Sequence, residues 1–370
     1  QITTESNPFR GLEAAYSHWL CSLKSSLPQD HMFGFYGIMT VLGVDLPDPD
    51  YSKSEVEVSE MTSIALIRSS ASLDILQCCV RINILTSIPS WVLAPSTDIP
   101  KWLIDDVSTF ITRDHKASRR TDAAHSQMSG PGRLTVQGVI IGRVESLMVS
   151  SVIGSSNTHA QEQEIPYCSY IHACQSWCQH VAHRAGCCSR EDVVEAAMRV
   201  LLFGDLRWLR GHNETTRLDK LATFQEWFDL MLFPNCEILD PEEIRRMSQK
   251  RTAVLENKNP DHGIVASFMW KIAYSTQKEW GAAAEAVASE IFKYRNYALI
   301  VLDTGHLARG LYLCKEGDTV ALIAGCSSPI ALRPVKRNEY RLVTPLYVDG
   351  IMDGEAWPKN ESELEEIVLV

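Results

Sequence analysis

The sequence predicts an α+β fold, with N-terminal helices and a small antiparallel β-barrel that is split by a helical insertion. Apolar residues recur at helical spacing in the first part of the chain and again in its middle. A lone β-branched segment separates these parts, and from residue 296 short alternating segments follow one another between turn residues, as in small barrels. The expected organisation is a helical region at 1–112, a flexible loop at 113–133, the first barrel strand or strands at 134–149, the helical insertion at 150–295, barrel strands at 296–357 and a tail at 358–370.

Composition argues against several classes of partner. The 370 residues are 45% hydrophobic and 22% charged, which is enough for a substantial core. A net charge of -11 disfavours phosphate binding, so no nucleic-acid partner is expected. The apolar runs fall far short of the ~20 residues that a membrane helix needs, so no membrane partner is expected either. The eleven cysteines are odd in number and no signal peptide is recognisable, which predicts reduced thiols in a cytoplasmic protein.

Helical signals open the chain. Apolar residues at helical spacing predict a helix over residues 10–24, and a short helix is expected within 28–38. Ser54 and Glu57 have the spacing of a capping box, in which the hydroxyl and the carboxylate each satisfy a free backbone N–H. This box predicts the start of a helix that carries Met61, Ile64, Ala65 and Ile67.

Strand and turn signals follow. Residues 113–133 are polar and end in Gly-Pro-Gly, which predicts a mobile surface loop. The β-branched residues of 134–144, with Gly138 and Gly142 among them, predict a strand that is bulged at a glycine. Helices are expected after Ser189, around 221–231, after Asp240 and within 262–295. The strands expected beyond them are 297–302, 319–324, 330–335, 339–343 and 346–348, with a hairpin turn at 303–306.

Catalytic and metal-binding signatures are mostly missing from the sequence. It contains no P-loop, GxSxG elbow, HExxH pair or paired CxxC site, so neither a catalytic residue nor a cofactor is expected. The weak metal candidates are Cys174, Cys178, Cys187 and Cys188. On one helix the histidines of this segment would fall roughly opposite Cys174 and Cys178, so only the cysteines could converge. Buried reduced thiols are the favoured interpretation.

Two stretches of the chain resemble fungal heterokaryon-incompatibility (HET-domain) proteins. The stretch 30–38 followed by Pro-Asp-Tyr-Ser-Lys-Ser at 49–54 is similar to one family segment, and 72–76 and 88–92 are similar to the family's L-D-L-L and L-P-S-W-V pieces. Near the end, 303–305, 316–320, 329–334, 340–343 and 347–355 are similar to its C-terminal motifs, including P-G-D-x-V, P-x-x-L-R-P and G-I-M-D-G-E. The residues that carry the resemblance are Asp30, Phe33, Gly37, Asp50, Tyr51, Trp91, Gly317, Asp318, Arg333, Pro334, Tyr347, Gly350, Met352, Asp353, Gly354 and Glu355.

The resemblance implies both a fold and a biological setting. It implies that the strand at 134–144 pairs with the C-terminal strands, and that the protein acts in fungal non-self recognition and programmed cell death. The motifs of the HET core itself, S-Y-x-W-G and W-I-D-A-L-C-I-N-Q, are absent, so no catalytic residue carries over. Two further departures are Leu93-Ala94-Pro95 after Trp91-Val92, and Asp349 where the family has His. The 350–355 segment is expected to be a turn rather than a ligand site, because its glycines permit positive φ.

Three hypotheses for function remain open at this point. The first is a non-catalytic regulatory and recognition region whose partner is a missing N-terminal HET core or another protein. The second is an intracellular hydrolase or NAD-consuming enzyme. The third is a truncated HET-like product with no activity. The sequence leaves the oligomeric state undecided.

Overall fold

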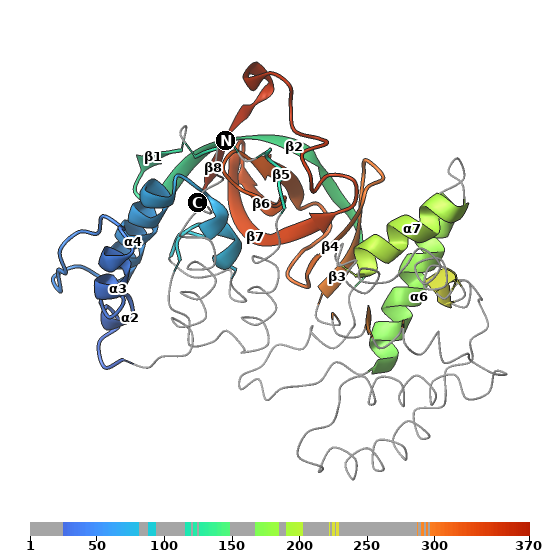
Figure 1. Cartoon of the computed structure of the whole chain (residues 1–370), viewed down its shortest axis with the longest axis horizontal. Helices are drawn as coiled ribbons and strands as arrows, with labels where there is room; N and C mark the ends of the chain where they lie inside the picture. Colours follow the sequence, from blue (N-terminus) through green and yellow to red (C-terminus); the bar gives the residue numbers. More distant parts are fainter. Residues whose placement is uncertain are drawn as a thin grey trace, which may run out of the picture. The chain divides into compact units, whose positions relative to one another are not determined.

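The computed structural model describes residues 25–80, 88–93, 115–119, 121–123, 126–148, 167–184, 190–202 and 297–370, with isolated positions between 222 and 294 (Figure 1). The chain divides into two compact units. The first unit comprises residues 1–145 and 313–370, and the second comprises Ser146–Tyr312. Each unit is described by itself.

Three helices and a 3-10 turn open the described part of the first unit. They are α2 (Asp30–Phe33), α3 (Tyr36–Val41), α4 (Glu55–Ser70) and η1 (Asp74–Cys78). The predicted capping box is confirmed at the start of α4, where the Ser54 N–H donates to Glu57 Oε2 at 2.8 Å and the Glu57 N–H donates to Ser54 Oγ at 3.3 Å. The helix ends at Ala71, whose φ of 50° lies in the left-handed region. The side chains that α4 buries are Val58, Ser59, Thr62, Ser63, Ala65, Leu66 and Ile67.

The sheet of the first unit contains a closed series of strand pairings. Its strands are β1 (Gln127–Gly130), β2 (Arg133–Met148), β5 (Thr319–Ile323), β6 (Ile330–Lys336), β7 (Glu339–Val348) and β8 (Glu365–Leu369). Antiparallel pairings join β2 to β5, β5 to β6 and β6 to β7. The strand β8 is parallel to β7 and antiparallel to β2, so the pairings return to β2. We call β2, β5, β6, β7 and β8 the strand ring (Figure 1). The predicted pairing of the lone strand with the C-terminal strands is thus confirmed.

Two segments that the sequence predicts to lie outside the strands differ from that prediction. Residues 358–370 were expected to be a tail, yet the structure places β8 in them as a paired strand of the ring. The expected surface loop at 113–133 contains β1, and within it Ala117 and Ser118 are fully buried. Residues 113–133 are polar and carry no core signal, and the apolar end of the chain, Ile367 to Val370, is preceded by a run rich in glutamate that hides the strand. The backbone groups of both segments are satisfied by partners far away in the sequence.

A glycine in β2 allows the ring to close tightly. A Cβ at Gly138 would lie 2.5 Å from the Leu322 carbonyl oxygen of β5 and 2.9 Å from Ile367 of β8. The expected bulge is present further along β2, where the register against β5 shifts between Ile140 and Gly142. The two glycines therefore serve different purposes. Gly138 lets the backbone of β5 approach β2 closely, and Gly142 lies at the bulge in β2.

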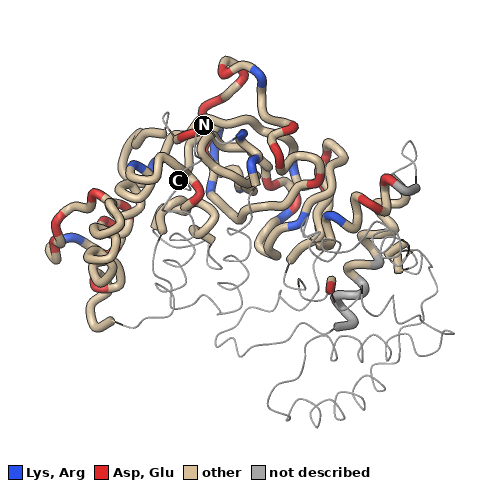
Figure 2. The backbone as a smooth tube through the Cα atoms, in the orientation of Figure 1, with Lys and Arg blue, Asp and Glu red and all other residues tan. Residues whose placement is uncertain are grey.

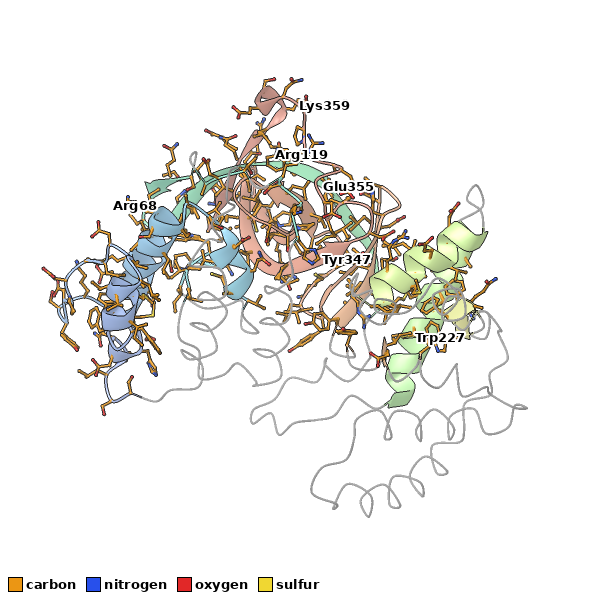
Figure 3. The ribbon with its side chains drawn as sticks, viewed as in Figure 1. Arg68, Arg119, Trp227, Tyr347, Glu355 and Lys359 are labelled. Atoms are coloured by element: carbon orange, nitrogen blue, oxygen red, sulfur yellow. The ribbon has the colours of Figure 1, made fainter. Side chains whose placement is uncertain are left out.

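The longer described stretches of the second unit form two helices and a β-hairpin. The helices are α6 (Tyr167–Arg184) and α7 (Arg190–Leu201), and β3 (Tyr297–Leu302) pairs antiparallel with β4 (Leu307–Leu311) through the predicted turn. Every residue of β3 is buried. The buried residues of the second unit include Trp177, Cys178, Val181, Val194, Ala197, Met198, Leu201, Phe224, Trp227 and Phe228. Trp227 is labelled in Figure 3. The helices expected at 10–24, after Asp240 and over 262–295 lie wholly or almost wholly outside the described residues.

A buried arginine organises the described part of the second unit. Arg309 of β4 is fully buried and donates to the Leu201 carbonyl at the end of α7 and to the Tyr294 carbonyl. Its guanidinium also lies 5.3 Å from the centre of the Tyr294 ring, a distance suited to a cation–π contact. Within the described residues, no helix is both long and apolar enough to cross a membrane.

The close approach at Gly138 gives the first prediction. Gly138→Ala should lower the free energy of unfolding by about 1–3 kcal/mol, because the added methyl group overlaps the backbone of β5. The control is Gly37→Ala on α3, where a Cβ meets nothing within 4 Å. That change should stabilise the helix by about 0.5–1 kcal/mol. Urea denaturation of both variants measures the difference, and equal stabilities would contradict the tight packing of β2 on β5.

Candidate functional site

The resemblance-bearing residues of the C-terminal strands meet in a buried ion pair. Asp318, at the start of β5, is 2% exposed. Arg333 of β6 donates from Nε to Asp318 Oδ1 and from Nη2 to Oδ2, both at 2.9 Å, and from Nη2 to the Leu313 carbonyl at 2.9 Å. The Lys315 N–H also donates to Asp318 Oδ2 at 2.8 Å. This two-pronged geometry fixes the turn before β5 against β6 and occupies the carboxylate with structural contacts.

The same turn also bonds to β2. Gly317 has a φ of 87°, a conformation that favours glycine. Its N–H donates to the Val144 carbonyl at 2.8 Å, and the Val144 N–H donates to the Asp318 carbonyl at 2.8 Å. The Gly-Asp pair of the motif therefore joins three strands of the ring, β2, β5 and β6, at one place.

A cysteine beside this ion pair is held as a thiol. Cys314 is 2% exposed. Burial raises its pKa well above the ordinary value, the nearby Asp318 carboxylate raises it further, and the Arg333 guanidinium opposes the shift. A thiol with a raised pKa is a poor nucleophile at neutral pH, so Cys314 is suited to packing rather than to catalysis.

Asp74 connects the N-terminal part of the chain to the turn between β5 and β6. Its Oδ1 accepts from the Ser327 N–H at 2.6 Å and from Gln77 Nε2 at 2.8 Å. The Gln77 amide also donates to Ser327 Oγ at 2.9 Å, and the Leu73 N–H donates to the Gly325 carbonyl at 2.7 Å. The Ser-Leu-Asp-Ile-Leu segment therefore binds the backbone of a turn some 250 residues away in sequence.

Ser90 and Trp91 bind the ends of the ring strands. The Ser90 hydroxyl donates to the Val370 carbonyl at 2.6 Å and accepts from the Leu342 N–H of β7 at 2.9 Å, and the Ser90 N–H donates to the same carbonyl at 3.0 Å. Trp91 is fully buried, and its Nε1 donates to the Gly132 carbonyl at 3.0 Å. The Pro-Ser-Trp-Val segment thus holds β7, the residue after β8 and the entry to β2 together.

Residues 115–119, which we call the strap, lie across two turns of the ring. The Lys116 N–H donates to the Met352 carbonyl at 2.8 Å, and Arg119 Nε donates to the Gly354 carbonyl at 3.0 Å. Ala117 and Ser118 bond the Ser327 and Cys326 carbonyls of the other turn, at 3.0 Å and 2.7 Å. Figure 3 labels Arg119, Glu355 and Tyr347 in this part of the molecule.

The Gly-Ile-Met-Asp-Gly-Glu segment is the predicted turn. Gly350 and Gly354 have φ values of 77° and 89°, and a Cβ at Gly354 would lie 2.5 Å from Arg119 Cγ. Met352 is buried and its Sδ accepts from the Val348 N–H at 3.2 Å, whereas Asp353 and Glu355 are exposed. The Asp353 N–H donates to Glu355 Oε2 at 2.8 Å, so part of this acidic pair is used within the turn itself.

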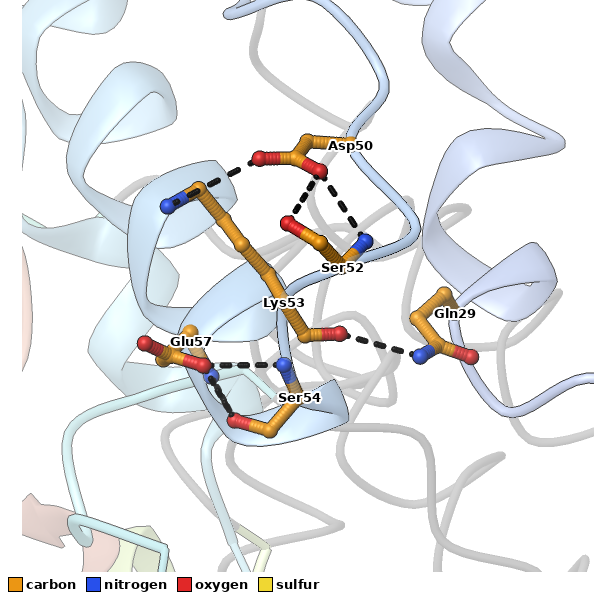
Figure 4. A network of polar contacts seen from close by, with 6 residues as sticks. All are labelled: Gln29, Asp50, Ser52, Lys53, Ser54 and Glu57. Atoms are coloured by element: carbon orange, nitrogen blue, oxygen red, sulfur yellow. Dashed lines mark hydrogen bonds and ion pairs between the residues drawn. The ribbon is translucent and has the colours of Figure 1, made fainter.

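The N-terminal motif forms a separate cluster around α2 and the start of α4. Tyr51 donates to Asp30 Oδ1 at 2.7 Å, and its ring packs edge-on against Phe33 at 5.0 Å. The hydrogen bond to Asp30 raises the pKa of Tyr51. Asp50 accepts from the Ser52 N–H and hydroxyl, at 2.9 Å and 2.7 Å. Figure 4 shows the contacts of Asp50 with Ser52 and Lys53, and the Gln29 side chain, which donates to the Lys53 carbonyl at 3.0 Å.

The metal candidates are only partly covered by the structure. Cys174 and Cys178 lie one turn apart on α6 and are both buried, and burial followed by the proximity of Cys174 raises the pKa of Cys178. Cys187 and Cys188 lie outside the described residues. Among the residues that the structure describes, no group of three or more His, Cys, Asp or Glu side chains is placed to hold a metal ion.

Sequence reasoning selected some of these contacts and missed others. It chose Asp30, Tyr51, Asp318 and Arg333 as separate motif residues, without predicting contacts between them. The structure brings them together as two bonded pairs, Asp318 with Arg333 and Asp30 with Tyr51. Of the remaining motif residues, Gly37 lies on α3, Pro334 on β6 and Tyr347 on β7. The missed contact residues are Asp74, Ser90, Arg119 and Ser327. Asp74 and Ser90 stand inside matching segments, so their polar side chains between apolar neighbours were an available signal.

Comparisons with known proteins match one part of the chain. Residues 276–370 match the family model described as the Het-6 beta-barrel domain. Neither the curated proteins nor the solved structures that were compared contain a match. The matched range includes β5 to β8, whereas β2, Asp74, Ser90 and the strap lie before it.

The buried ion pair gives a prediction for stability. Asp318→Asn should lower the free energy of unfolding by about 3–5 kcal/mol, because it leaves the Arg333 charge without its carboxylate in a largely buried position. The control is Glu195→Gln, which removes a carboxylate from the exposed pair with Arg199 on α7. That pair should contribute less than about 1 kcal/mol. Thermal and urea unfolding measure both, and a comparable loss in the two variants would contradict the structural role of Asp318.

Ser90 gives a more local prediction. In Ser90→Ala the Leu342 N–H loses its acceptor and the Val370 carbonyl loses one of its two Ser90 donors. The amide of Leu342 should then exchange with deuterium faster, by roughly tenfold for a destabilisation of about 1.4 kcal/mol. Hydrogen exchange followed by mass spectrometry reads this directly. Ser126→Ala is the control, because the Ser126 hydroxyl donates locally to the Ala123 carbonyl at 2.8 Å and its loss should leave Leu342 unaffected.

Proposed function

We propose that the chain, whose residues 276–370 match the family model described as the Het-6 beta-barrel domain, is a non-catalytic regulatory and recognition region of a heterokaryon-incompatibility-type protein. In this proposal the strand ring is the barrel of the matched family, and β2, which precedes the match, is one of its strands. The segment between β2 and β3 is then a helical insertion that splits the barrel in sequence.

One observation carries this proposal: the polar motif residues hold distant parts of the chain together. Asp74 bonds the turn after β5, Ser90 bonds β7 and the end of β8, and Asp318 bonds Arg333. Side chains used in this way are suited to holding a rigid surface, because several hydrogen bonds fix the position of each bonded segment. They are poorly suited to acid–base or nucleophilic chemistry, which needs groups directed at a substrate.

The biological role follows from the family by analogy. Proteins of the heterokaryon-incompatibility type are linked to fungal non-self recognition and programmed cell death, and we assign this chain to the same process in the fungal cytoplasm. Its partner in the proposal is a HET core or another protein, which the rigid region restrains or releases. The net charge of -11 disfavours nucleic acid as that partner.

Co-expression with a toxic HET core tests the proposal. In yeast, a separately expressed HET core that kills the cells should kill fewer of them when the full chain is present, because the chain restrains the core. The chain alone should leave growth unchanged. The variant Asp74→Ala should restrain the core less well, since it frees the β5–β6 turn, while Glu195→Gln should act like the natural chain. Colony counts give the readout.

Two outcomes would contradict the proposal. One is killing by the core that is unaffected by the chain at matched expression levels. The other is turnover of NAD or of a generic ester by the purified chain, measured by chromatography of the reaction mixture. Such turnover would favour the hydrolase or NAD-consuming hypothesis.

A further inference from the structure

Helix α3 is apolar on two faces, and one of these faces is exposed. Tyr36 and Met39 are buried, and the Tyr36 hydroxyl contacts the Thr62 hydroxyl of α4 at 2.9 Å. Ile38, Val41 and the following Leu42 are 47%, 86% and 38% exposed. Their spacing of three and four residues places them along a single stripe of the helix. Adjacent exposed apolar side chains of this kind have the character of a contact surface.

The chain around this stripe carries mostly negative charge. Residues 36–50 contain no Lys or Arg, and the exposed Asp45 and Asp48 lie three and six residues after Leu42. Figure 2 draws Asp and Glu in red and Lys and Arg in blue, and red predominates over the segment from α2 to α4. Across residues 25–70 the acidic residues are Asp30, Asp45, Asp48, Asp50, Glu55, Glu57 and Glu60. The basic residues of that range are Lys53, which pairs with Asp50 at 3.9 Å, and Arg68, near the end of α4. The apolar stripe is therefore followed in the chain by exposed aspartates and by no basic residue before Lys53.

We propose that the stripe formed by Ile38, Val41 and Leu42 is a docking site for a partner protein that presents an apolar helix flanked by Lys or Arg. This inference rests on the proposed recognition function and names the surface that performs it. The apolar side chains supply the contact area, and the aspartates attract the basic flanks and fix their orientation.

Charge decides against two other occupants. A second copy of the chain would bring the same aspartates to the contact, and both copies carry a net charge of -11. An anionic membrane surface attracts basic rather than acidic segments, so it would be repelled here. A basic amphipathic helix is the occupant that both the apolar stripe and the aspartates favour.

A model peptide tests the proposal with the full chain. The probe is a fluorescent 18-residue helical peptide of Leu and Lys, and its counterpart has Glu in place of Lys. The variants are Val41→Asp and, as a control of equal charge change, Val335→Asp at an exposed apolar position on β6. Fluorescence anisotropy should show that Val41→Asp binds the Leu/Lys peptide at least tenfold more weakly than the natural chain. Val335→Asp should bind it within twofold, and the Leu/Glu peptide should bind at least tenfold more weakly.

The sign of the effect separates the proposal from simple charge attraction. Val41→Asp adds a negative charge, so attraction by net charge alone would strengthen binding of the Leu/Lys peptide. Unchanged or tighter binding by Val41→Asp would overturn the proposal, as would equal weakening by Val335→Asp. Self-association that Val41→Asp abolishes in sedimentation, or binding of the natural chain to phosphatidylserine vesicles, would assign the stripe to a different occupant and overturn it as well.

The growth assay separates this proposal from the one on which it rests. If the natural chain restrains the HET core and Val41→Asp does so equally well, the docking site is wrong while the regulatory function stands. If the natural chain does not restrain the core, the regulatory function fails whatever the peptide does. If Val41→Asp no longer restrains the HET core while Val335→Asp still does, both the regulatory function and the docking site are supported.

Discussion

The first unit depends on β2 meeting strands from the far end of the chain. Its residues pair with β5 on one side and with β8 on the other, and without it the ring has two open edges. Closing so long a loop costs conformational entropy, but this cost rises only slowly with loop length. The backbone hydrogen bonds and buried apolar side chains of the ring offset it, and an open edge would leave those backbone groups exposed for unwanted pairing. Closure is thus the condition under which the remaining contacts form.

The segments outside the ring bind mainly to its turns and strand ends. Asp74 and the strap bond the backbone between Gly325 and Ser327, and Ser90 bonds Leu342 and Val370. Buried turns leave N–H and C=O groups that no strand partner satisfies, and each such group needs another partner. Polar residues from distant parts of the sequence provide these partners. This explains why polar residues such as Asp74 and Ser90 occur within the motifs although their contacts are structural.

The sequence predicts a structural feature correctly where residues close together in the chain determine that feature. The capping box at Ser54, the bulge in β2, the hairpin turn before β4 and the turn at 350–355 are each set by residues within a few positions of one another. The sequence does not predict the strand β8, because two of its five residues are glutamates. It does not predict the burial of the strap either, because the strap bonds backbone groups that are remote in the sequence. Arg119 could not be identified, since its acceptor is a backbone carbonyl at Gly354. The metal candidates Cys187 and Cys188 lie outside the described residues, so that interpretation stays a prediction.

The order of the strands along the chain has a consequence for synthesis on the ribosome. The strand β2 is made long before β5 and β8, its two partners in the ring. At elongation rates of roughly 5–20 residues per second, the nascent β2 remains unpaired for a time on the order of tens of seconds. During that interval a long strand with apolar side chains and free backbone groups is open to aggregation or to capture by chaperones. Production of the folded protein is therefore sensitive to translation speed and chaperone supply, a dependence that a ring built from consecutive hairpins would largely avoid.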